Sequence, residues 1–327
     1  MIIAFHVENF SYRGTEVATY DYAFYNQKIL GNKSIIVYPR DRRPDMANIK
    51  TKFISTFESY EYDNKAELEQ YIALKGIRAV YILKYGKNTD NIVSLSVPLL
   101  VHCVYDSSMP HGTVYASISE SVSKGRTPIV PHIIEVDPTD GDFRKELNIP
   151  SDAIVFGRHG GPDTFNIDFV RDVIYDTVNN NSNIYFIFAV KPFIFDKQHP
   201  QIKFISEFSS PVIKRKFINT CDAMIHACSL GESFGLSVLE FSKCNKPVIT
   251  FNGGEWNRQH LAHLGDLAVL YNDKIELSTI FKNWKEDTLQ GKCNKDYTKI
   301  CEKFKPENVM RQFDEVFLKI VKDNPRD

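Results

Sequence analysis

Short runs of β-branched and aromatic residues alternate along the chain with longer amphipathic stretches. In the first half the strand-like runs are 2–7, 34–38, 52–57, 79–83, 99–104, 114–119 and 129–133. In the second half they are 153–157, 184–190, 202–206, 223–227, 247–251 and 268–271. Alternation of this kind is typical of βα units repeated around parallel sheets. The pattern therefore predicts an α/β fold with two parallel sheets.

Glycines support two of the predicted helices. The helical stretches 15–30 and 64–75 are followed by Gly31 and Gly76, and glycine often closes a helix in the left-handed conformation. The tail at 274–321 contains three helical stretches and no strand-like run. The C-terminal part of the chain is therefore predicted to be helical.

A polar stretch at 137–142 interrupts the alternation, and 143–148 is predicted to form a short helix after it. The chain of 327 residues is about twice the ~150 that serve as a prior for one domain. We therefore expect an N-terminal domain at 1–136, a second domain at 137–305, and a C-terminal helix at 306–327 that packs back across the domains.

Charge and composition limit the classes of ligand. The 40 Lys and Arg against 41 Asp and Glu give a net charge of -1, so no overall field attracts nucleic acid or an anionic membrane. No apolar run approaches the ~20 residues of a membrane-spanning helix, and the N-terminus is unlike a signal peptide. Six cysteines without a C-x-x-C pair favour reduced thiols over a zinc site. We expect a cytoplasmic protein that holds its ligand locally.

In open parallel sheets, ligands bind beyond the carboxyl ends of the strands, where loops lead into helices. The first βα loops lack the G-x-G-x-x-G fingerprint of dinucleotide binding, which argues against an NAD-dependent dehydrogenase. In the loop 8–16, Gly14 opens a helix whose N–H groups could approach an anion. A plain tight turn is the alternative for this loop.

A stronger candidate is the loop 157–161, which follows a predicted strand and precedes a helix. Gly160 and Gly161 would let the backbone approach a ligand closely. The guanidinium of Arg158 suits phosphate oxygens. The alternative is a surface charge on a turn.

The sharpest feature lies at 231–240, between a predicted strand and a helix that begins near Gly235. N–H groups at the positive end of such a helix suit a diphosphate. The residues expected there are Ser233, Phe234, Gly235 and Leu236. Glu232 lies outside this helix end, and Glu240 lies inside the helix in an almost uncharged segment.

The two carboxylates, Glu232 and Glu240, are eight positions apart, so their backbones are separated by roughly 12 Å or more. Acid pairs of glycosidases lie only ~5 to 9.5 Å apart. The pair therefore suits the two ends of one long ligand, and a nucleoside diphosphate sugar fits. Two glutamates on a surface helix are the alternative.

A family resemblance rests on several elements that occur in a fixed order. They are Gly157-Arg158, Glu232 and Glu240 with Phe234-Gly235-Leu236 between them, Lys246-Pro247-Val248, and Gly253-Gly254. Together they resemble the retaining GT-B glycosyltransferases of family 4, the group 1 glycosyltransferases. Stretches 117–121 and 131–137 resemble the residues that precede the second domain in that family.

The resemblance implies a GT-B fold: two Rossmann-like parallel-sheet domains facing a cleft, with a helical C-terminal tail. The acceptor would bind mainly to the first domain and the nucleotide sugar mainly to the second, without a metal or other cofactor. By the same likeness Arg158 would neutralise the diphosphate, Glu232 would contact sugar hydroxyls and Glu240 would bind ribose. Gly14 would lie under the phosphates. His102 resembles a first-domain histidine that approaches the donor sugar, and a histidine packed in a strand is its alternative.

The chain departs from the family pattern at two places. The family usually has a lysine about five residues after the arginine, where this chain has Asp163, Thr164 and Phe165. Lys191, or a residue of the cluster 214–216, is a candidate replacement. The stretch 131–135 also lacks the expected Asn-Gly, which puts the function of that turn in doubt.

The sequence predicts a retaining, metal-independent hexosyltransferase that moves a sugar from a nucleoside diphosphate to a glycan or other hydroxyl acceptor. A binding protein with a degenerate site and a nucleotide-sugar epimerase are the alternatives. The Asp-x-Asp at 140–142 lies in the predicted linker, so a solvated turn explains it better than a metal site. The basic clusters 40–43 and 214–216 lack interleaved aromatic residues, so we expect no nucleic-acid partner.

Overall fold

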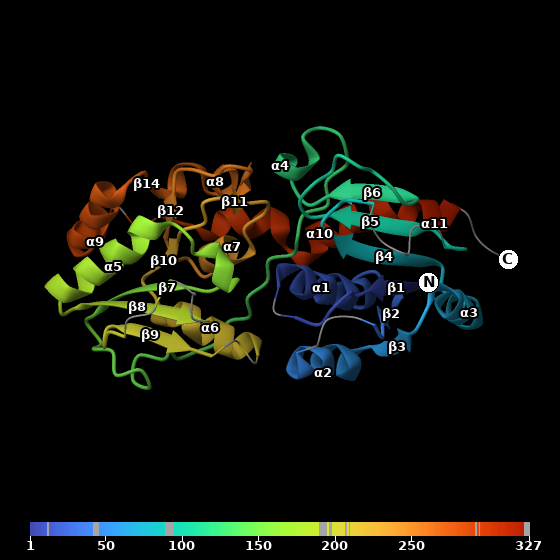
Figure 1. Cartoon of the computed structure of the whole chain (residues 1–327), viewed down its shortest axis with the longest axis horizontal. Coiled ribbons are helices and arrows are strands. Elements are labelled where there is room, and N and C mark those ends of the chain that lie inside the picture. The colour runs from blue at the N-terminus through green and yellow to red at the C-terminus, as the bar shows by residue number, and fades with distance from the viewer. Residues whose placement is uncertain are drawn as a thin grey trace. The chain divides into compact units, whose positions relative to one another are not determined.

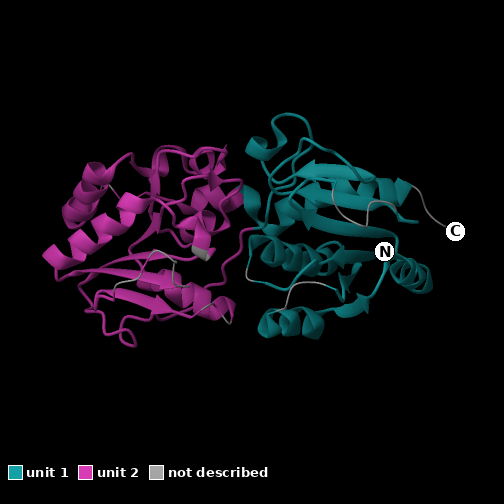
Figure 2. Cartoon of the chain, in the orientation of Figure 1, with its two compact units in different colours: residues 1–133, 303–327 teal, residues 134–302 magenta. Residues whose placement is uncertain are grey.

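The computed structural model describes residues 1–11, 13–41, 46–88, 95–189, 195, 198–206, 208, 210–291, 293 and 295–323. The chain forms two compact units (Figure 2). Unit 1 comprises Met1–Ile133 and Lys303–Asp327, and unit 2 comprises Ile134–Glu302. The sequence placed the corresponding boundaries at 136/137 and 305/306.

Unit 1 contains a six-stranded parallel sheet in the order β3-β2-β1-β4-β5-β6 (Figure 1). Its strands are β1 (Ile2–His6), β2 (Lys33–Pro39), β3 (Glu58–Tyr62), β4 (Ala79–Lys84), β5 (Leu99–Cys103) and β6 (Val114–Ser117). Its helices are α1 (Gly14–Lys28), α2 (Ala47–Thr56), α3 (Lys65–Lys75), α4 (Glu120–Ser123), α10 (Pro306–Phe313), the π-helical turn η4 (Asp314–Leu318) and α11 (Lys319–Asp323). The 3-10 segment η3 (Thr298–Phe304) spans the boundary with unit 2.

Successive strand residues of unit 1 point to opposite faces of its sheet. Val80 and Ile82 pack with Leu68 of α3 on one face. Tyr81, between them, contacts the rings of Tyr22 on α1 and Phe313 on α10. The C-terminal helix α10 therefore completes the core of unit 1.

Unit 2 contains a second six-stranded parallel sheet, in the order β14-β12-β10-β7-β8-β9. Its strands are β7 (Ile154–Arg158), β8 (Ile184–Ala189), β9 (Ile202–Ile205), β10 (Ala223–His226), β12 (Val248–Phe251) and β14 (Val269–Tyr271). A separate two-stranded ribbon joins β11 (Gly231–Glu232) to β13 (Asn257–Arg258). The helical segments are η1 (Pro162–Thr164), α5 (Asp168–Asn180), α6 (Pro211–Thr220), α7 (Leu236–Lys243), α8 (Gln259–Leu264), η2 (Gly265–Leu267) and α9 (Lys274–Leu289).

The core of unit 2 has the same two-faced pattern. Phe156 packs in a cluster with Phe281 of α9, whereas its neighbour Val155 packs in another cluster with Phe217 of α6 and Val238 of α7. Burial on both faces explains why the strands of this sheet are almost continuously apolar. The prediction of an α/β fold with two parallel sheets is thus confirmed.

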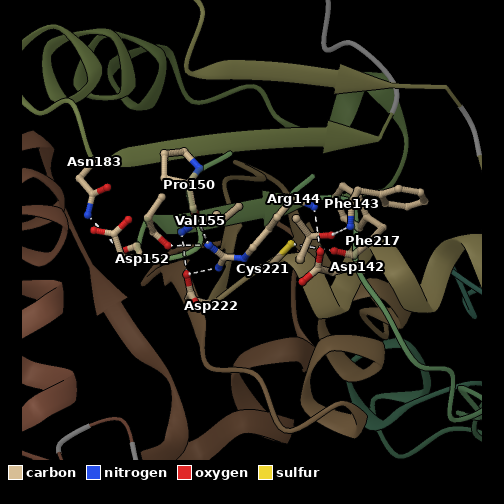
Figure 3. A network of polar contacts seen from close by, with 12 residues as sticks. Asp142, Phe143, Arg144, Pro150, Asp152, Val155, Asn183, Phe217, Cys221 and Asp222 are labelled. Carbon is tan, nitrogen blue, oxygen red and sulfur yellow. Dashed lines mark hydrogen bonds and ion pairs between the residues drawn. The ribbon is translucent and has the colours of Figure 1, made fainter. Parts of the chain in front are cut away.

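Arg144 ties the segment before β7 to the amino-terminal edge of the unit 2 sheet (Figure 3). Its guanidinium donates to the carbonyl oxygen of Ala153 at 2.8 Å and to Oδ2 of Asp222 at 3.0 Å. The same Asp222 oxygen accepts from the backbone N–H of Val155 at 2.8 Å. The polar stretch that the sequence treated as a linker is therefore followed at once by residues anchored in unit 2.

Three local predictions were wrong. Residues 52–57 were predicted as a strand but lie mostly in α2, which buries Phe53. Of the predicted strand 129–133, the structure shows an isolated bridge between Ser117 and Ile129. Residues 143–148 form turns instead of a helix: the N–H of Leu147 donates to the carbonyl oxygen of Phe143 at 2.9 Å, but Asn148 has a φ of 53°, in the left-handed region, which ends the turn.

Among the described residues, we find no helix whose length and apolar character would allow it to cross a membrane. The predicted helical tail is confirmed: α9, α10 and α11 follow β14 with 3-10 and π-helical segments between them.

Candidate active site

Helix α7 begins directly after Gly235, as the sequence predicted. Gly235 has a φ of 89°, in the left-handed region, and a Cβ built on it would lie 3.0 Å from Cβ of His260. Both facts explain why position 235 is occupied by glycine. The first turn of α7 has no acidic residue, and the described part of the chain provides no side-chain cap for it. The positive end of this helix is therefore available to an anion.

Arg158 is the last residue of β7 and is only 2% exposed. Its Nη2 donates to the carbonyl oxygen of Gly161 and, at 2.7 Å, to Oγ1 of Thr164. The other terminal nitrogen, Nη1, is buried and has no hydrogen-bond partner among the residues that the structure describes. A buried guanidinium with an unused donor is suited to an anionic ligand.

Burial lowers the pKa of Arg158 to about 10, and the nearby carboxylate of Glu232 partly opposes this shift. Arg158 therefore remains charged at neutral pH. The side chains of Arg158 and Glu232, from the strand end of β7 and the segment before α7, are therefore close enough to interact electrostatically.

Glycines bring the two loops together. Gly160 has a φ of +135°, and a Cβ on it would lie 3.6 Å from Nη2 of Arg158 and 3.9 Å from Oγ of Ser237 on α7. A Cβ on Gly161 would lie 2.9 Å from Oδ1 of Asp163. The Arg158 loop is thus folded tightly next to the first turn of α7.

Glu240 lies inside α7 and is 7% exposed. One of its carboxylate oxygens accepts a hydrogen bond from Nζ of Lys214 on α6. Burial by itself would raise the pKa of Glu240, but the charge of Lys214 and the imidazole of His159 outweigh it, so the pKa is lowered. The buried acid therefore has the partner that its environment requires.

His159 is the other neighbour of Glu240. Its Nε2 lies 3.2 Å from Oε2 of Glu240, outside hydrogen-bond geometry. Its ring is stacked on Phe241 with centroids 5.7 Å apart. Burial lowers the pKa of His159 to about 4, so the imidazole is neutral at pH 7 and Lys214 supplies the opposing charge.

Glu232 is positioned by a histidine at the end of β10. Nε2 of His226 lies 3.2 Å from Oε1 of Glu232, and its Nδ1 lies 2.9 Å from Oγ1 of Thr250. The ring of His260 packs on His226 with centroids 4.8 Å apart. Two bonded nitrogens fix the orientation of the His226 ring and so hold the Glu232 carboxylate at the carboxyl end of the sheet.

The other residues of the predicted helix end differ in role. Phe234 is buried, and its ring packs against His263 with centroids 5.2 Å apart, so its side chain belongs to the packing. Ser233 precedes Gly235, and Leu236 is the first residue of α7. Backbone groups are therefore what this segment offers to a ligand.

Two of the predicted residues, Gly14 and His102, belong to unit 1. Gly14 begins α1 in unit 1, where Glu16 occupies the first turn and accepts from the hydroxyls of Ser11 and Thr15, each at 2.9 Å. This carboxylate makes the N-terminus of α1 less suited to phosphate than we predicted. Lys191 lies outside the described residues.

His102 is a core residue in this structure and is 0% exposed. Its Nδ1 lies 2.7 Å from the hydroxyl of Tyr81, and its Nε2 lies 2.8 Å from the carbonyl oxygen of Val130. Burial lowers its pKa to about 3. Both nitrogens are engaged inside unit 1, which favours the alternative of a histidine packed in a strand, and the role beside the donor sugar stays a prediction.

Sequence reasoning did not assign His226 or His159 to the site, although both lie at strand ends that it searched. It named Lys214 only as a possible phosphate cation. Lys214 and Glu240 are 26 positions apart, and no local sequence pattern indicates that they pair.

A cavity of about 650 Å³ lies at the opposite, amino-terminal edge of the unit 2 sheet. Asp152, Asp222, Lys246 and Trp284 are among the residues that line it. Ligands of open parallel sheets bind at the other edge, so the chemistry of the Arg158 loop, and not cavity size, identifies the candidate site.

The described ranges contain no group of three or more His, Cys, Asp or Glu side chains arranged to hold a metal ion. Positive charge at the site comes from Arg158 and Lys214. The six cysteines are free thiols.

No family model matches the chain, and no curated protein matches it in sequence. Solved structures do match. HepE of Anabaena in complex with UDP-glucose has 15% sequence identity and a TM-score of 0.73 over 96% of this chain and 98% of its own. A glycosyltransferase from Rickettsia africae has 12% identity and a TM-score of 0.72 over 99% of both chains.

A third solved structure bears on the alternatives. A putative UDP-N-acetylglucosamine 2-epimerase from Listeria monocytogenes has 10% identity and a TM-score of 0.61, over 99% of this chain and 98% of its own. At such identities the likeness concerns the fold. With two parallel-sheet α/β units and a helical C-terminal region, the chain has the GT-B fold of these glycosyltransferases.

Proposed function

We propose that the chain is a retaining, metal-independent glycosyltransferase that moves a hexose from a nucleoside diphosphate to a hydroxyl of a glycan or other acceptor. The observation that carries the proposal is the buried Arg158, with an unused donor among the described residues, next to the uncapped end of α7. The complex of HepE with UDP-glucose makes UDP sugars the first donors to test.

In the proposed reaction the bond between the anomeric carbon and the β-phosphate oxygen breaks, and a bond to the acceptor oxygen forms on the same face. The acceptor proton passes to an oxygen of the leaving diphosphate. Arg158 and the N-terminal end of α7 stabilise the charge that develops on that group. Glu240 accepts hydrogen bonds from ribose hydroxyls, with Lys214 as its counterion. Glu232, held by His226, accepts from hydroxyls of the sugar.

The test is to incubate the chain with UDP-, GDP- and ADP-sugars and to measure the nucleoside diphosphate and free sugar that are released. We expect slow hydrolysis of one donor class and retention of the anomeric configuration, read by proton NMR. Binding of a donor without turnover would instead indicate a binding protein.

Glu232→Gln should lower the rate of donor cleavage by about 10- to 100-fold, the value of one hydrogen bond to a charged group, while the affinity for UDP changes less. Glu286→Gln, an exposed position on α9, is the matched control. Equal losses in UDP affinity and in rate would remove Glu232 from the sugar end of the site.

The epimerase alternative draws support from the structural likeness to the putative UDP-N-acetylglucosamine 2-epimerase. An epimerase acting at C2 exchanges the hydrogen of that carbon with solvent. In deuterium oxide, deuterium at C2 of the recovered sugar would favour this alternative, and its absence would favour transfer. We propose a cytoplasmic setting, in which the six free thiols stay reduced.

A further inference from the structure

The two tryptophans of the chain are in opposite environments. Trp284 is 5% exposed and packs against Phe156 in the core of unit 2, with ring centroids 5.2 Å apart. Trp256 is 66% exposed and lies in the loop directly before β13. Tryptophan, whose ring is apolar with one polar N–H group, is enriched at binding interfaces.

The backbone around Trp256 is fixed to the segment before β11. The N–H groups of Trp256 and Asn257 donate to the carbonyl oxygen of Leu230 at 3.3 and 3.2 Å. The N–H of Glu255 donates to the carbonyl oxygen of Ser229 at 3.2 Å. The exposed indole is therefore carried on a hydrogen-bonded backbone.

The approach of the two strands is so close that only glycine fits at two positions. A Cβ on Gly231 would lie 1.8 Å from the carbonyl oxygen of Asn257, and one on Gly254 would lie 2.8 Å from it. In the resulting register Glu232 is paired with Arg258, two residues after Trp256. The ribbon thus places Trp256 two residues before Arg258, the strand partner of the proposed sugar carboxylate Glu232.

Leu230 adds a second exposed apolar side chain to this ribbon. A pyranose ring presents a face of C–H bonds and a rim of hydroxyls, so it stacks on an aromatic plane while its rim donates to carboxylates. Trp256 and Leu230 supply exposed apolar side chains on the same ribbon as Glu232, the carboxylate proposed for the donor sugar, so a second saccharide ring on these side chains would lie beside the donor.

We propose that Trp256 is the stacking platform for the hexopyranose ring of a saccharide acceptor; this inference rests on the proposed function. Arg158 and Glu240, which would hold the nucleotide, are buried, whereas Trp256 is two-thirds exposed. The exposed platform is suited to the partner that enters after the donor and leaves as product. The ring of the donor sugar has the same chemistry, and the experiment separates the two.

Trp256 is its own reporter, because the only other tryptophan is buried. The full chain, saturated with UDP, is titrated with methyl α- and β-glucopyranoside and methyl α- and β-galactopyranoside while tryptophan emission is recorded. We expect at least one probe to shift the emission to shorter wavelength in the wild type. Trp256→Phe, in which only Trp284 emits, should show no shift.

The affinity is measured separately by saturation-transfer NMR on the same glycosides. Trp256→Ala should weaken binding of the responsive glycoside by about 10-fold or more, and Trp256→Phe should weaken it less, since stacking is partly kept. Leu289→Ala, another exposed apolar position, is the matched control and should leave binding unchanged.

No emission shift with any of the four glycosides would overturn the proposal. A second result would also overturn it: UDP-glucose shifts the emission relative to UDP, but the free glycosides cause no shift. Trp256 would then stack on the donor sugar. If a glycoside shifts the emission but the chain neither binds nor cleaves nucleotide sugars, saccharide stacking on Trp256 is supported and the proposed function is refuted.

Discussion

Two buried basic side chains, His102 in unit 1 and Arg158 in unit 2, differ in how far their nitrogens are hydrogen-bonded. In unit 1 both ring nitrogens of His102 are hydrogen-bonded, to Tyr81 and to Val130. In unit 2, Nη1 of Arg158 is buried and meets no acceptor in the part of the chain that the structure describes. Leaving a buried donor unpaired costs about 1–3 kcal/mol, and more when it is charged. The contrast favours a structural role for His102 and supports the proposed ligand role of Arg158.

The helices that follow the two candidate phosphate-binding loops, α1 and α7, show the same contrast. Helix α1 has its own carboxylate, Glu16, in its first turn, and hydroxyls of Ser11 and Thr15 hold it there. Helix α7 begins at Gly235 with no acid in its first turn. An anion should therefore bind at α7 in preference to α1.

The largest effect is expected from Arg158→Met. Loss of the guanidinium should lower kcat/KM for cleavage of UDP-glucose by about 10²- to 10³-fold, the usual value of one donor that stabilises developing charge. The turn should persist, because Oγ1 of Thr164 also donates to the carbonyl oxygen of Gly161 at 2.9 Å. The measurement is initial-rate kinetics together with UDP binding by calorimetry.

Arg171→Met, on α5, is the control for Arg158→Met, since it removes the same group from a partly exposed position. If both variants lost similar activity, or if Arg158→Met kept full UDP affinity, the contrast between the two units would fail.

The second prediction concerns how the free energy of unfolding depends on pH. The pKa of His102 is lowered to about 3 by burial, against an unfolded value near 6.5. The stability that neutral His102 contributes is therefore complete above about pH 6.5 and is lost as the pH falls toward 3, at about 1.4 kcal/mol per pH unit. Denaturant unfolding of the chain between pH 7 and pH 4 should include this contribution beside that of His132, whose pKa burial also lowers, and comparison with His102→Gln isolates it.

His102→Gln should flatten that slope by about one proton while the chain still cleaves UDP-glucose at neutral pH. A slope that does not change would show that His102 titrates normally. Loss of donor cleavage in a folded His102→Gln chain would support the predicted role of His102 beside the donor sugar.

Glu240→Gln should weaken UDP by roughly 10-fold, because a charged acceptor for ribose hydroxyls is replaced by a neutral one. Pyrophosphate lacks the ribose, so its affinity should change much less. Calorimetry with both ligands separates a ribose contact from a general loss of the site. Equal weakening of UDP and pyrophosphate would mean that the Lys214 pair with Glu240 acts on the phosphates instead.

The smallest effect is expected from Glu16→Gln. Removing a carboxylate from the first turn of α1 should change the free energy of unfolding by about 0.3–1 kcal/mol and leave UDP affinity nearly unchanged. Thermal unfolding and calorimetry measure the two quantities. A gain in UDP affinity of about 5-fold or more would locate a phosphate at Gly14 and erase the difference between α1 and α7.

Strands with continuous apolar runs were predictable because both sheet faces are buried. The strand β3 was not, since its residues Glu58–Tyr62 are mostly polar and half-buried at the sheet edge. The apolar residues at 52–57 looked like a strand, but Phe53 faces the core from α2. An isolated pattern of two or three apolar residues does not separate a helix from an edge strand.

The candidate site was predictable where its residues are close in sequence. The position of Gly235 before a helix and the glycines after Arg158 carry local backbone information, and the structure has both features. The partner of Glu240 comes from α6, and the environment of His102 comes from strands and helices along the whole of unit 1. Tertiary packing determines the partners of Glu240 and His102, and no local sequence pattern indicates these partners.

The connectivity of the chain has a practical consequence. Residues 134–302 form one uninterrupted stretch, whereas the other half is assembled from both ends of the polypeptide, with Phe313 closing over Phe5 and Tyr81. A truncation after residue 302 would remove α10, whose Phe313 packs on the core of unit 1. The uninterrupted piece would keep Arg158, Glu232 and Glu240, which makes it the natural fragment to express alone for ligand mapping.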